Sequence, residues 1–372
     1  MNESAPFHGS YRPQDVEFLL KPLERSALET VADIAAKEAL IQSGQRHYSE
    51  MLTPETLPSE EYRRLFFAAY RRNAARMAAE CLALARHIAA CTSTPVLLSL
   101  ARAGTPVGAV VAHLVRRITG QAVPHYSVSI IRGRGIDANA LDAVLARGAQ
   151  PENIVFIDGW TGKGVIADEL QAALKKYNFS RGTAIAPRLF VLADLAGKAF
   201  YAASWDDYLI PSSILNATIS GLVSRSVLNS AIGAGDFHGC LFYREFTAHD
   251  LSVWFVDDMV QRATALMDAA PASALLPAPP DGSAQQRYTA FLTAEMLRYG
   301  VTDRNLIKPG IGEATRVLLR RLPQRLVVRN PRHADVQHLL ALAREKAVPV
   351  DVRPDLPLVH AVAIIKGASR AL

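Results

Sequence analysis

The stretch Asn153–Leu170 reads NIVFIDGWTGKGVIADEL, and its pattern decides what the middle of the chain builds. The apolar run IVFI ends on Asp158, and a loop of small residues, GWTGKG, leads into VIADEL, whose apolar spacing is helical. A short apolar run bounded by glycines favours a buried strand. The stretch therefore predicts a strand, a tight loop and a helix, with the acid where the strand ends.

The same alternation repeats on both sides of this stretch. From residue 94 onward, short apolar runs alternate with segments of helical periodicity. The expected strands cover residues 94–100, 123–131, 153–158 and 188–194, and the expected helices cover residues 107–120, 137–148 and 165–177. Strands separated by helices predict an α/β fold, with a parallel sheet and helices on both of its faces. Ligands of such sheets bind at the carboxyl ends of the strands.

The ends of the chain differ from this middle region. Helical spacing over residues 25–90 predicts an N-terminal helical extension, and a smaller α/β pattern follows a segment rich in alanine and proline. We expect a first domain over 1–265, made of a helical N-terminal segment (residues 1–92) and a core (residues 93–265). A linker over 266–286 and a C-terminal domain over 287–372 should follow it.

The basic charge of the chain is concentrated at its C-terminus. The formal net charge is +6, and residues 301–372 hold ten arginines and three lysines against six acidic residues. A basic domain of this kind indicates a phosphate-bearing partner, or a solvated basic face with no partner.

The three cysteines, Cys81, Cys91 and Cys240, are far apart in the sequence. Their spacing excludes a disulfide framework and a cysteine zinc site, which favours the reducing cytoplasm. The polar N-terminus is not typical of a secretory signal, and no apolar run has the length of a membrane span. We therefore expect a cytoplasmic protein with no membrane partner.

Two loops of small residues precede expected helices, at 158–164 and 99–108. Free N–H groups at a helix N-terminus bind phosphate, and glycines let the backbone close around an anion. The candidate phosphate-binding residues are Thr161, Gly162, Lys163 and Gly164 in one loop and Ala103 and Gly104 in the other, with Arg102 beside them. Neither loop has the spacing of a Walker A or dinucleotide motif. Together they predict a substrate with two phosphate groups.

The motif VFIDGWTGKG resembles the phosphoribosyl-diphosphate loop of phosphoribosyltransferases, and SLARAGTPVG is similar to their pyrophosphate loop. The resemblance implies a type I phosphoribosyltransferase-like sheet, with Asp158 facing ribose hydroxyls and Mg²⁺ arriving with phosphoribosyl diphosphate rather than on direct protein ligands. It implies as catalytic residues Asp158, Arg102, Arg132 and Arg134, the last two in a flexible lid, IIRGRGID. Gly159 departs from the pattern, because many members carry a second acid there.

A closer resemblance covers nearly the whole chain. SGQRHYSEML, ARAGTPVG, FIDGWTGKG and LIPSSILNATISGLVSRSVLN, followed by the basic unit, are similar to a bacterial family of stress and tellurite-resistance gene clusters. Its members join a phosphoribosyltransferase-like domain to a Pelota-type RNA-binding domain. The family is also labelled the StiP cysteine protease family, and the two labels imply different enzymes.

The stretch GAGDFHGCLFYREF, residues 233–246, offers a cysteine nucleophile. Cys240 follows His238 by two residues, so the two side chains share a face if the stretch is a strand. A thiol needs a nearby imidazole or helix end to become reactive, and a small buried cysteine is the alternative interpretation.

The C-terminal unit carries a glycine turn followed by a basic helix, KPGIGEATRVLLRR. It resembles Pelota and L7Ae RNA-binding domains, in which a Gly-x-x-Glu turn contacts kinked RNA. The candidate RNA-binding residues are Lys308, Gly310, Gly312, Glu313, Arg316 and Arg320. No aromatic residue follows Tyr299, which disfavours stacking on single-stranded bases.

From the sequence, the preferred function is phosphoribosyl transfer from phosphoribosyl diphosphate with Mg²⁺ to an unidentified acceptor, with RNA or a ribonucleoprotein as partner. Two alternatives remain: a StiP-type cysteine protease acting through Cys240, and a non-catalytic sensor of a phosphoribosyl ligand. The sequence leaves a homo-oligomer open.

Overall fold

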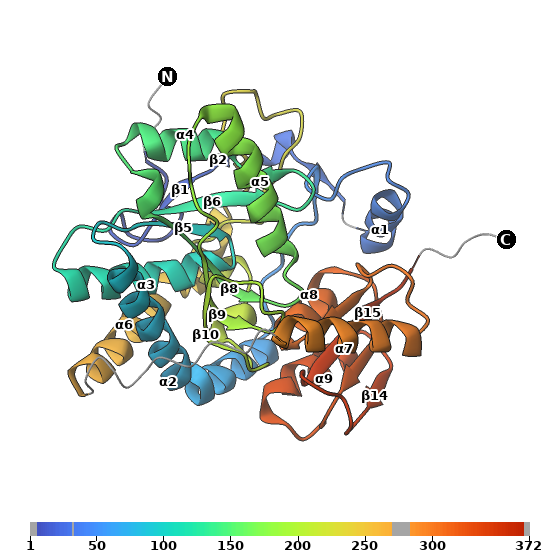
Figure 1. Cartoon of the computed structure of the whole chain (residues 1–372). Coiled ribbons are helices and arrows are strands. Elements are labelled where there is room, and N and C mark those ends of the chain that lie inside the picture. The colour runs from blue at the N-terminus through green and yellow to red at the C-terminus, as the bar shows by residue number, and fades with distance from the viewer. Residues whose placement is uncertain (1–5, 32, 270–282, 368–372) are drawn as a thin grey trace.

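A parallel sheet forms the centre of the larger domain in the computed structural model, which describes residues 6–31, 33–269 and 283–367 (Figure 1). Its strand order is β1-β6-β5-β8-β9-β10, and all neighbours on this path are parallel. The strands are β1 (Glu17–Leu19), β5 (Val96–Ala101), β6 (His125–Ile131), β8 (Ile154–Thr161), β9 (Leu189–Asp194) and β10 (Tyr201–Ser204), and β7 (Gly135–Ile136) pairs antiparallel with β6.

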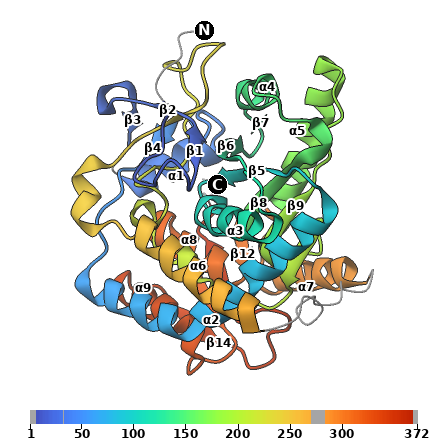
Figure 2. The same cartoon turned by 90° about the vertical axis from the view of Figure 1, so that its left-hand side faces the viewer.

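Helices cover both faces of this sheet, as Figures 1 and 2 show. The helices on one face are α2 (Glu60–Cys91), α3 (Gly104–Thr119) and α6 (Ser252–Ala269), and those on the other are α4 (Ala138–Ala146) and α5 (Val165–Arg181). Successive strand residues alternate between the two cores: Ile157 packs with the first group of helices and Phe156 with the second. The predicted α/β fold, with a parallel sheet and helices on both faces, is confirmed.

The helical extension that the periodicity predicts over residues 25–90 is confirmed for α2 (Glu60–Cys91), but the region before it differs. It contributes the edge strand β1, and two short strands, β2 (Lys21–Pro22) and β3 (Glu29–Thr30), which pair with β11 (Gly239–Cys240) and β4 (Met51–Leu52). Helix α1 spans only Ile34–Gln42. Strands of two or three residues are too short to show a period of two, so local pattern does not reveal them.

The C-terminal domain is a smaller α/β unit with a mixed four-stranded sheet in the order β12-β15-β13-β14. Its elements are α7 (Ala284–Arg298), β12 (Ile307–Pro309), α8 (Ile311–Arg320), β13 (Pro323–Val328), α9 (Gln337–Glu345), β14 (Val350–Val352) and β15 (Ala361–Ile365). Short 3-10 helices lie at Arg25–Ala27, Pro151–Asn153, Pro211–Ser213, Ala217–Ile219, Arg244–His249 and Ala334–Val336.

Helix α8 and the turn before it face the first domain (Figure 1). The buried carboxylate of Asp207 accepts hydrogen bonds from Ile311 N at 2.8 Å and His360 N at 2.7 Å. Asp335 likewise accepts from Arg72 Nε at 2.9 Å. Because these bonds join backbone and side chains across the boundary, the two domains are held in a defined relative position.

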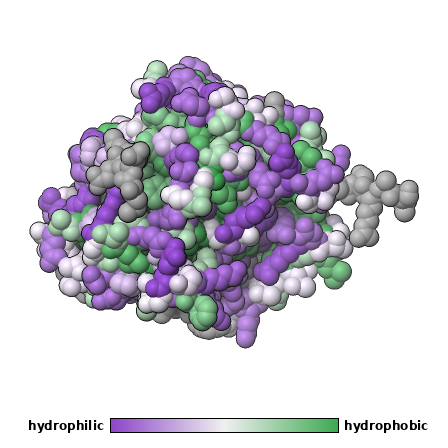
Figure 3. All heavy atoms as spheres, turned by 90° about the horizontal axis from the view of Figure 1, so that it is seen from above, coloured by the Kyte–Doolittle hydropathy of each residue, from purple (hydrophilic) through white to green (hydrophobic). Residues whose placement is uncertain are grey.

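Residues 270–282 of the expected linker lie outside the described residues, and α6 and α7 extend into its two ends. Hydrophilic and hydrophobic residues are interspersed over the face seen from above (Figure 3). None of the described helices is both long and apolar enough to cross a membrane.

Candidate functional site

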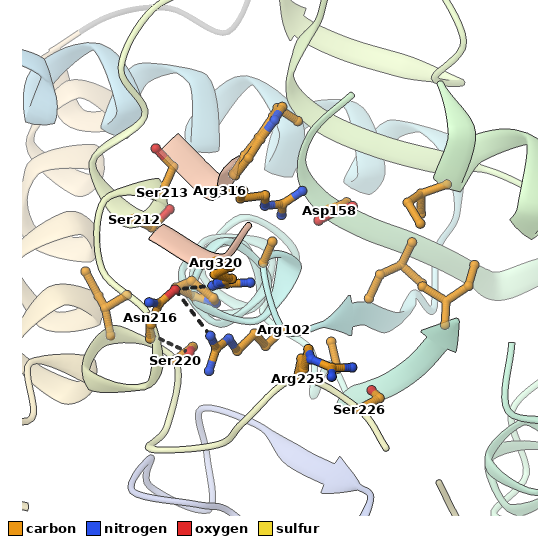
Figure 4. Close-up of a pocket in the computed structure, with 18 of the residues that line it drawn as sticks. Arg102, Asp158, Ser212, Ser213, Asn216, Ser220, Arg225, Ser226, Arg316 and Arg320 are labelled. Carbon is orange, nitrogen blue, oxygen red and sulfur yellow. Dashed lines mark hydrogen bonds between the residues drawn. The ribbon is translucent and has the colours of Figure 1, made fainter. Parts of the chain in front are cut away.

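Asp158 lies near the carboxyl end of β8 and lines a cavity of about 190 Å³ between the two domains (Figure 4). The residue is 7% exposed, and its Oδ1 atom accepts a hydrogen bond from Gly159 N at 2.7 Å. Burial raises the pKa of Asp158 to about 6, although the positive charge of Arg316 acts in the opposite direction. The acid therefore sits in a place that disfavours its charge.

This raised pKa predicts a pH-dependent cost to stability. The stabilising contribution of the neutral acid is present below the unfolded-state pKa of about 3.9 and is lost as the pH rises through about 6. We expect Asp158→Asn to raise the free energy of unfolding at pH 8 by roughly 1–3 kcal/mol and to change it little at pH 4. Urea denaturation at both pH values measures this, with the exposed Asp206→Asn as control. A lower stability at pH 8 would contradict the prediction.

The loop after β8 has its polar side chains engaged within the protein. Thr161 Oγ1 donates to Asp194 Oδ1, and Lys163 Nζ donates to the carbonyl oxygens of Ile307, at 3.0 Å, and Arg304. Burial and the nearby Lys308 lower the pKa of Lys163 to about 7. The hydroxyl and ammonium groups that the sequence assigned to a phosphate therefore already have partners.

A carboxylate from the C-terminal domain lies beside the glycine of this loop. A Cβ atom on Gly162 would be 2.7 Å from Glu313 Cγ, and Glu313 Oε1 accepts from Arg316 Nη1 at 2.9 Å. Burial alone would raise the pKa of Glu313, but Arg316, Lys308 and Lys163 lower it below its usual value. Glu313 thus occupies, as an anion, the place next to Gly162 in which the sequence predicted a phosphate.

Four arginines line the cavity beside Asp158, and we call it the arginine cavity. They are Arg102 and Arg225 from the first domain and Arg316 and Arg320 from α8, and Figure 4 shows them arranged around the cavity. Arg102 donates to Val223 O at 2.6 Å and pairs with the carboxylate of Glu55. Ala103 lies on the same wall, whereas Gly104 is packed on the backbone of β8.

The two arginines of the expected lid, in the turn between β6 and β7, have protein partners. Arg132 Nη1 donates to Asn305 Oδ1 at 3.1 Å, and Arg134 Nη2 lies 3.0 Å from Glu50 Oε1. Arg132 lines a second cavity of about 280 Å³, which also contains Lys163 and Lys308. The structure thus brings Arg132 close to the loop after β8 and ties Arg134 to the N-terminal region.

Cys240 lies in β11 and is fully buried, and burial raises the pKa of its thiol. His238 donates its backbone N–H to Asp137 Oδ2 at 2.6 Å, and its Nδ1 is 2.8 Å from Ser129 Oγ. Burial lowers the pKa of the His238 imidazole, with the charge of Asp137 acting against it. Imidazole, carboxylate and thiol therefore lie on neighbouring segments, with the thiol in a form that is not nucleophilic.

The other two cysteines differ in exposure. Cys81 is buried in α2, and burial raises the pKa of its thiol, whereas Cys91 is exposed at the end of that helix. His87 precedes Cys91 by four residues, so both lie on one face of the helix.

The predicted RNA-binding turn faces the first domain rather than solvent. A Cβ atom on Gly312 would be 2.5 Å from the Trp160 ring, and one on Gly310 would be 2.8 Å from Leu195. The Arg316 guanidinium lies 4.2 Å from the Trp160 ring centroid. Lys308 and Glu313 lie 3.9 Å apart in the same interface. In this conformation, RNA cannot reach the turn.

Sequence reasoning missed three residues that the structure brings to these sites. Arg225 lines the arginine cavity, and Glu55 pairs with Arg102 behind its wall. Both come from loops whose folding over the sheet has no local signature. Asp137 caps α4 by accepting a hydrogen bond from Asn139 N at 3.0 Å, and the sequence DANAL predicts this local role. No local pattern predicts its contact with His238, which is 101 residues away in the sequence.

Comparison with known proteins gives two family matches. Residues 9–260 match the family model described as tellurite-like stress resistance cysteine protease StiP, and residues 286–367 match the Pelota RNA-binding domain. A curated relative from Acinetobacter baylyi, named "Cysteine protease StiP", is 39% identical over 360 residues, covering 94% of this chain and 91% of its own length.

A solved structure, a hypothetical protein from Neisseria gonorrhoeae with bound ppGpp, aligns with 32% of this chain and 65% of its own at 16% identity. The TM-score of 0.21 is too low to support an argument. The 39% identical relative contradicts the prediction of phosphoribosyl transfer, because that relative is named a cysteine protease. The motifs VFIDGWTGKG and SLARAGTPVG misled because tight strand–helix loops resemble one another whatever they bind.

Proposed function

We propose, from the premise that the chain belongs to the StiP family of tellurite-like stress resistance cysteine proteases, that it hydrolyses peptide bonds with Cys240 as its nucleophile. The observation that carries the proposal is the 39% identity to the named protease, which extends over 94% of the chain. The free state of all three cysteines supports a reducing, cytoplasmic setting.

His238, two residues before Cys240, and Asp137, bonded to the His238 backbone, would supply the groups that such chemistry uses. His238, neutral because its pKa is lowered, would accept the thiol proton. The thiolate would attack the peptide carbonyl carbon, and the amine would leave with the proton from His238. Water would then hydrolyse the thioester. Asp137, bonded to the His238 backbone, would position the imidazole.

The described conformation is in our proposal a latent form of the enzyme. Pairing with β2 holds the Cys240 segment, since Leu23 N donates to Cys240 O at 2.8 Å and Lys21 N to His238 O at 2.9 Å. The ion pair of Lys21 with Asp236, 2.7 Å long, closes the end of this pairing. Because a buried thiol is not ionised, substrate cleavage requires the β2–β11 pairing to open.

Alkylation rates test this latency directly. In the folded wild-type protein we expect iodoacetamide to modify Cys91 first and Cys240 more slowly by roughly tenfold or more, the factor given by an opening free energy of about 1.4 kcal/mol. Mass spectrometry of peptides over time gives the two rates. Lys21→Ala, which removes the ion pair to Asp236, should speed the Cys240 reaction and leave the Cys91 rate unchanged. Equal rates in the wild type would contradict a latent form.

We further propose that the C-terminal domain binds RNA, on the basis of its match to the Pelota model and its basic charge. The turn predicted to contact RNA is packed against Trp160, so binding through this turn requires the two domains to separate.

A further inference from the structure

The arginine cavity collects positive charge from both domains without collecting an equal number of acids. Arg102 and Arg225 enter from the first domain and Arg316 and Arg320 from α8 (Figure 4). Asp158 is the carboxylate on its wall. Glu55, which pairs with Arg102, approaches from outside the wall. Arginine is the side chain best suited to phosphate, because its planar group donates two parallel hydrogen bonds.

The hydrogen bonds inside the protein satisfy Arg102 and Arg316 but leave donors of Arg225 and Arg320 without partners among the described residues. Arg102 and Arg320 both donate to one neutral acceptor, Asn216 Oδ1, as the dashed lines in Figure 4 show. Arg225 Nη2 donates to a backbone carbonyl, Met51 O. Four buried polar atoms on residues that line the cavity have no hydrogen-bond partner among the described residues: Arg320 Nε, Arg225 Nη1, Trp160 Nε1 and Ser226 Oγ. Buried donors without acceptors are rare because each one costs free energy.

The pKa values of the cavity arginines also indicate an excess of positive charge. Burial and the charges of Arg102, Arg316 and Arg225 together lower the pKa of Arg320 to about 9, against the pull of Glu55. Burial likewise lowers the pKa of Arg225 to about 10. Since guanidinium groups keep their protons in proteins, the four arginines repel one another, and Glu55 and Glu313 offset this repulsion only in part. A bound anion would reduce it further.

We propose that the arginine cavity binds a small polyanion, a molecule with at least two phosphate groups, held by arginines from both domains. The unpartnered donors of Arg320, Arg225 and Ser226 supply its hydrogen bonds after small side-chain rotations. The second cavity shares Asp158, Trp160, Arg316 and Arg320 with the first, so the two spaces adjoin each other at the arginines of α8. The enclosure between two domains favours a small molecule over an RNA backbone.

Such a ligand would act as a bridge. Its contacts to Arg102 and Arg225 on one side and to Arg316 and Arg320 on the other would hold the domains together, because each side alone supplies half of the guanidinium groups. The proposal does not depend on the peptidase chemistry, since it concerns binding alone. Asp158 opposes an anion, so its neutralisation should strengthen binding.

The test measures the binding of inorganic pyrophosphate to the full chain. Titration calorimetry gives the affinity, and the thermal unfolding midpoint is measured with and without the ligand. We expect pyrophosphate to raise the midpoint of the wild type more than sodium chloride or sulfate does at equal ionic strength. Arg320→Met should raise the midpoint without ligand, because it removes repulsion, and should weaken pyrophosphate binding by tenfold or more. Arg225→Gln should weaken binding similarly, so the result does not rest on one variant. Asp158→Asn should tighten binding.

Arg325→Gln is the matched control, because Arg325 lies in the same domain but pairs with Asp351, at 2.7 Å, away from the cavity. Unchanged binding is expected for this variant. Equal pyrophosphate affinity in the wild type and in both cavity variants would overturn the proposal. So would an Arg320-dependent response to an RNA oligonucleotide but not to pyrophosphate, since that result would assign the cavity to RNA.

Discussion

Cys240→Ala is expected to lower the rate of peptide hydrolysis by about a thousandfold or more, the scale on which removal of a covalent nucleophile acts in hydrolases. The substitution removes one buried sulfur atom from a packed segment, so the fold should survive it. A quenched fluorogenic peptide library or a casein digest measures the activity, with the unfolding midpoint measured in parallel. Peptide hydrolysis should be assayed under conditions that open the β2–β11 pairing. Faster alkylation of Cys240 identifies these conditions.

Cys91→Ala and Cys81→Ala are the controls for this experiment. Both should retain activity, because Cys91 lies at the far end of α2 and Cys81 lies inside it. Loss of activity in Cys91→Ala with full activity in Cys240→Ala would overturn the assignment and move the nucleophile to the exposed thiol one helical turn from His87. His238→Ala should follow Cys240→Ala, since a thiol without its base stays protonated.

Most of the central architecture was predictable from the chain because its signals are local. Strands such as β5 and β8 are built on apolar runs, which is typical of parallel strands buried on both faces, and the helices between them carry their own periodicity. The strand β1 was not predictable. Its three residues place Phe18 in one core and Leu19 in the other, and that role exists only once β6 lies beside it.

The candidate site was predictable only where one segment builds it. Asp158 and the glycines after it were identifiable in the sequence, because a strand end and a tight loop are local features. That Glu313 would approach Gly162 was not, since the two residues belong to different domains and only their packing unites them. The same holds for Arg225. Two motifs that the sequence presents as separate binding sites turn out to contact each other.

Gly312→Leu is expected to raise the affinity of the full chain for RNA by roughly tenfold at low salt, because it forces the RNA-binding turn away from the first domain. A side chain at this position begins with a Cβ atom 2.5 Å from the Trp160 ring, so docking and the leucine are incompatible. Gly312 lies in the first turn of α8, where leucine is a good helix former. The leucine side chain therefore disrupts the domain interface and leaves helix α8 intact.

Separation would expose Lys308, Arg316 and Arg320, and three additional phosphate contacts should steepen the slope of log affinity against log salt by about 2. Fluorescence anisotropy of a labelled oligonucleotide measures both the affinity and its salt slope. The salt range is about 50 to 200 mM, over which the affinity should change roughly tenfold. Gly235→Leu is the control, because no atom lies within 4 Å of a Cβ at that glycine. A Gly312→Leu chain whose affinity and salt slope match the wild type would show that RNA binds elsewhere. Weaker binding would show that RNA requires the docked arrangement, in which arginines from both domains face one cavity.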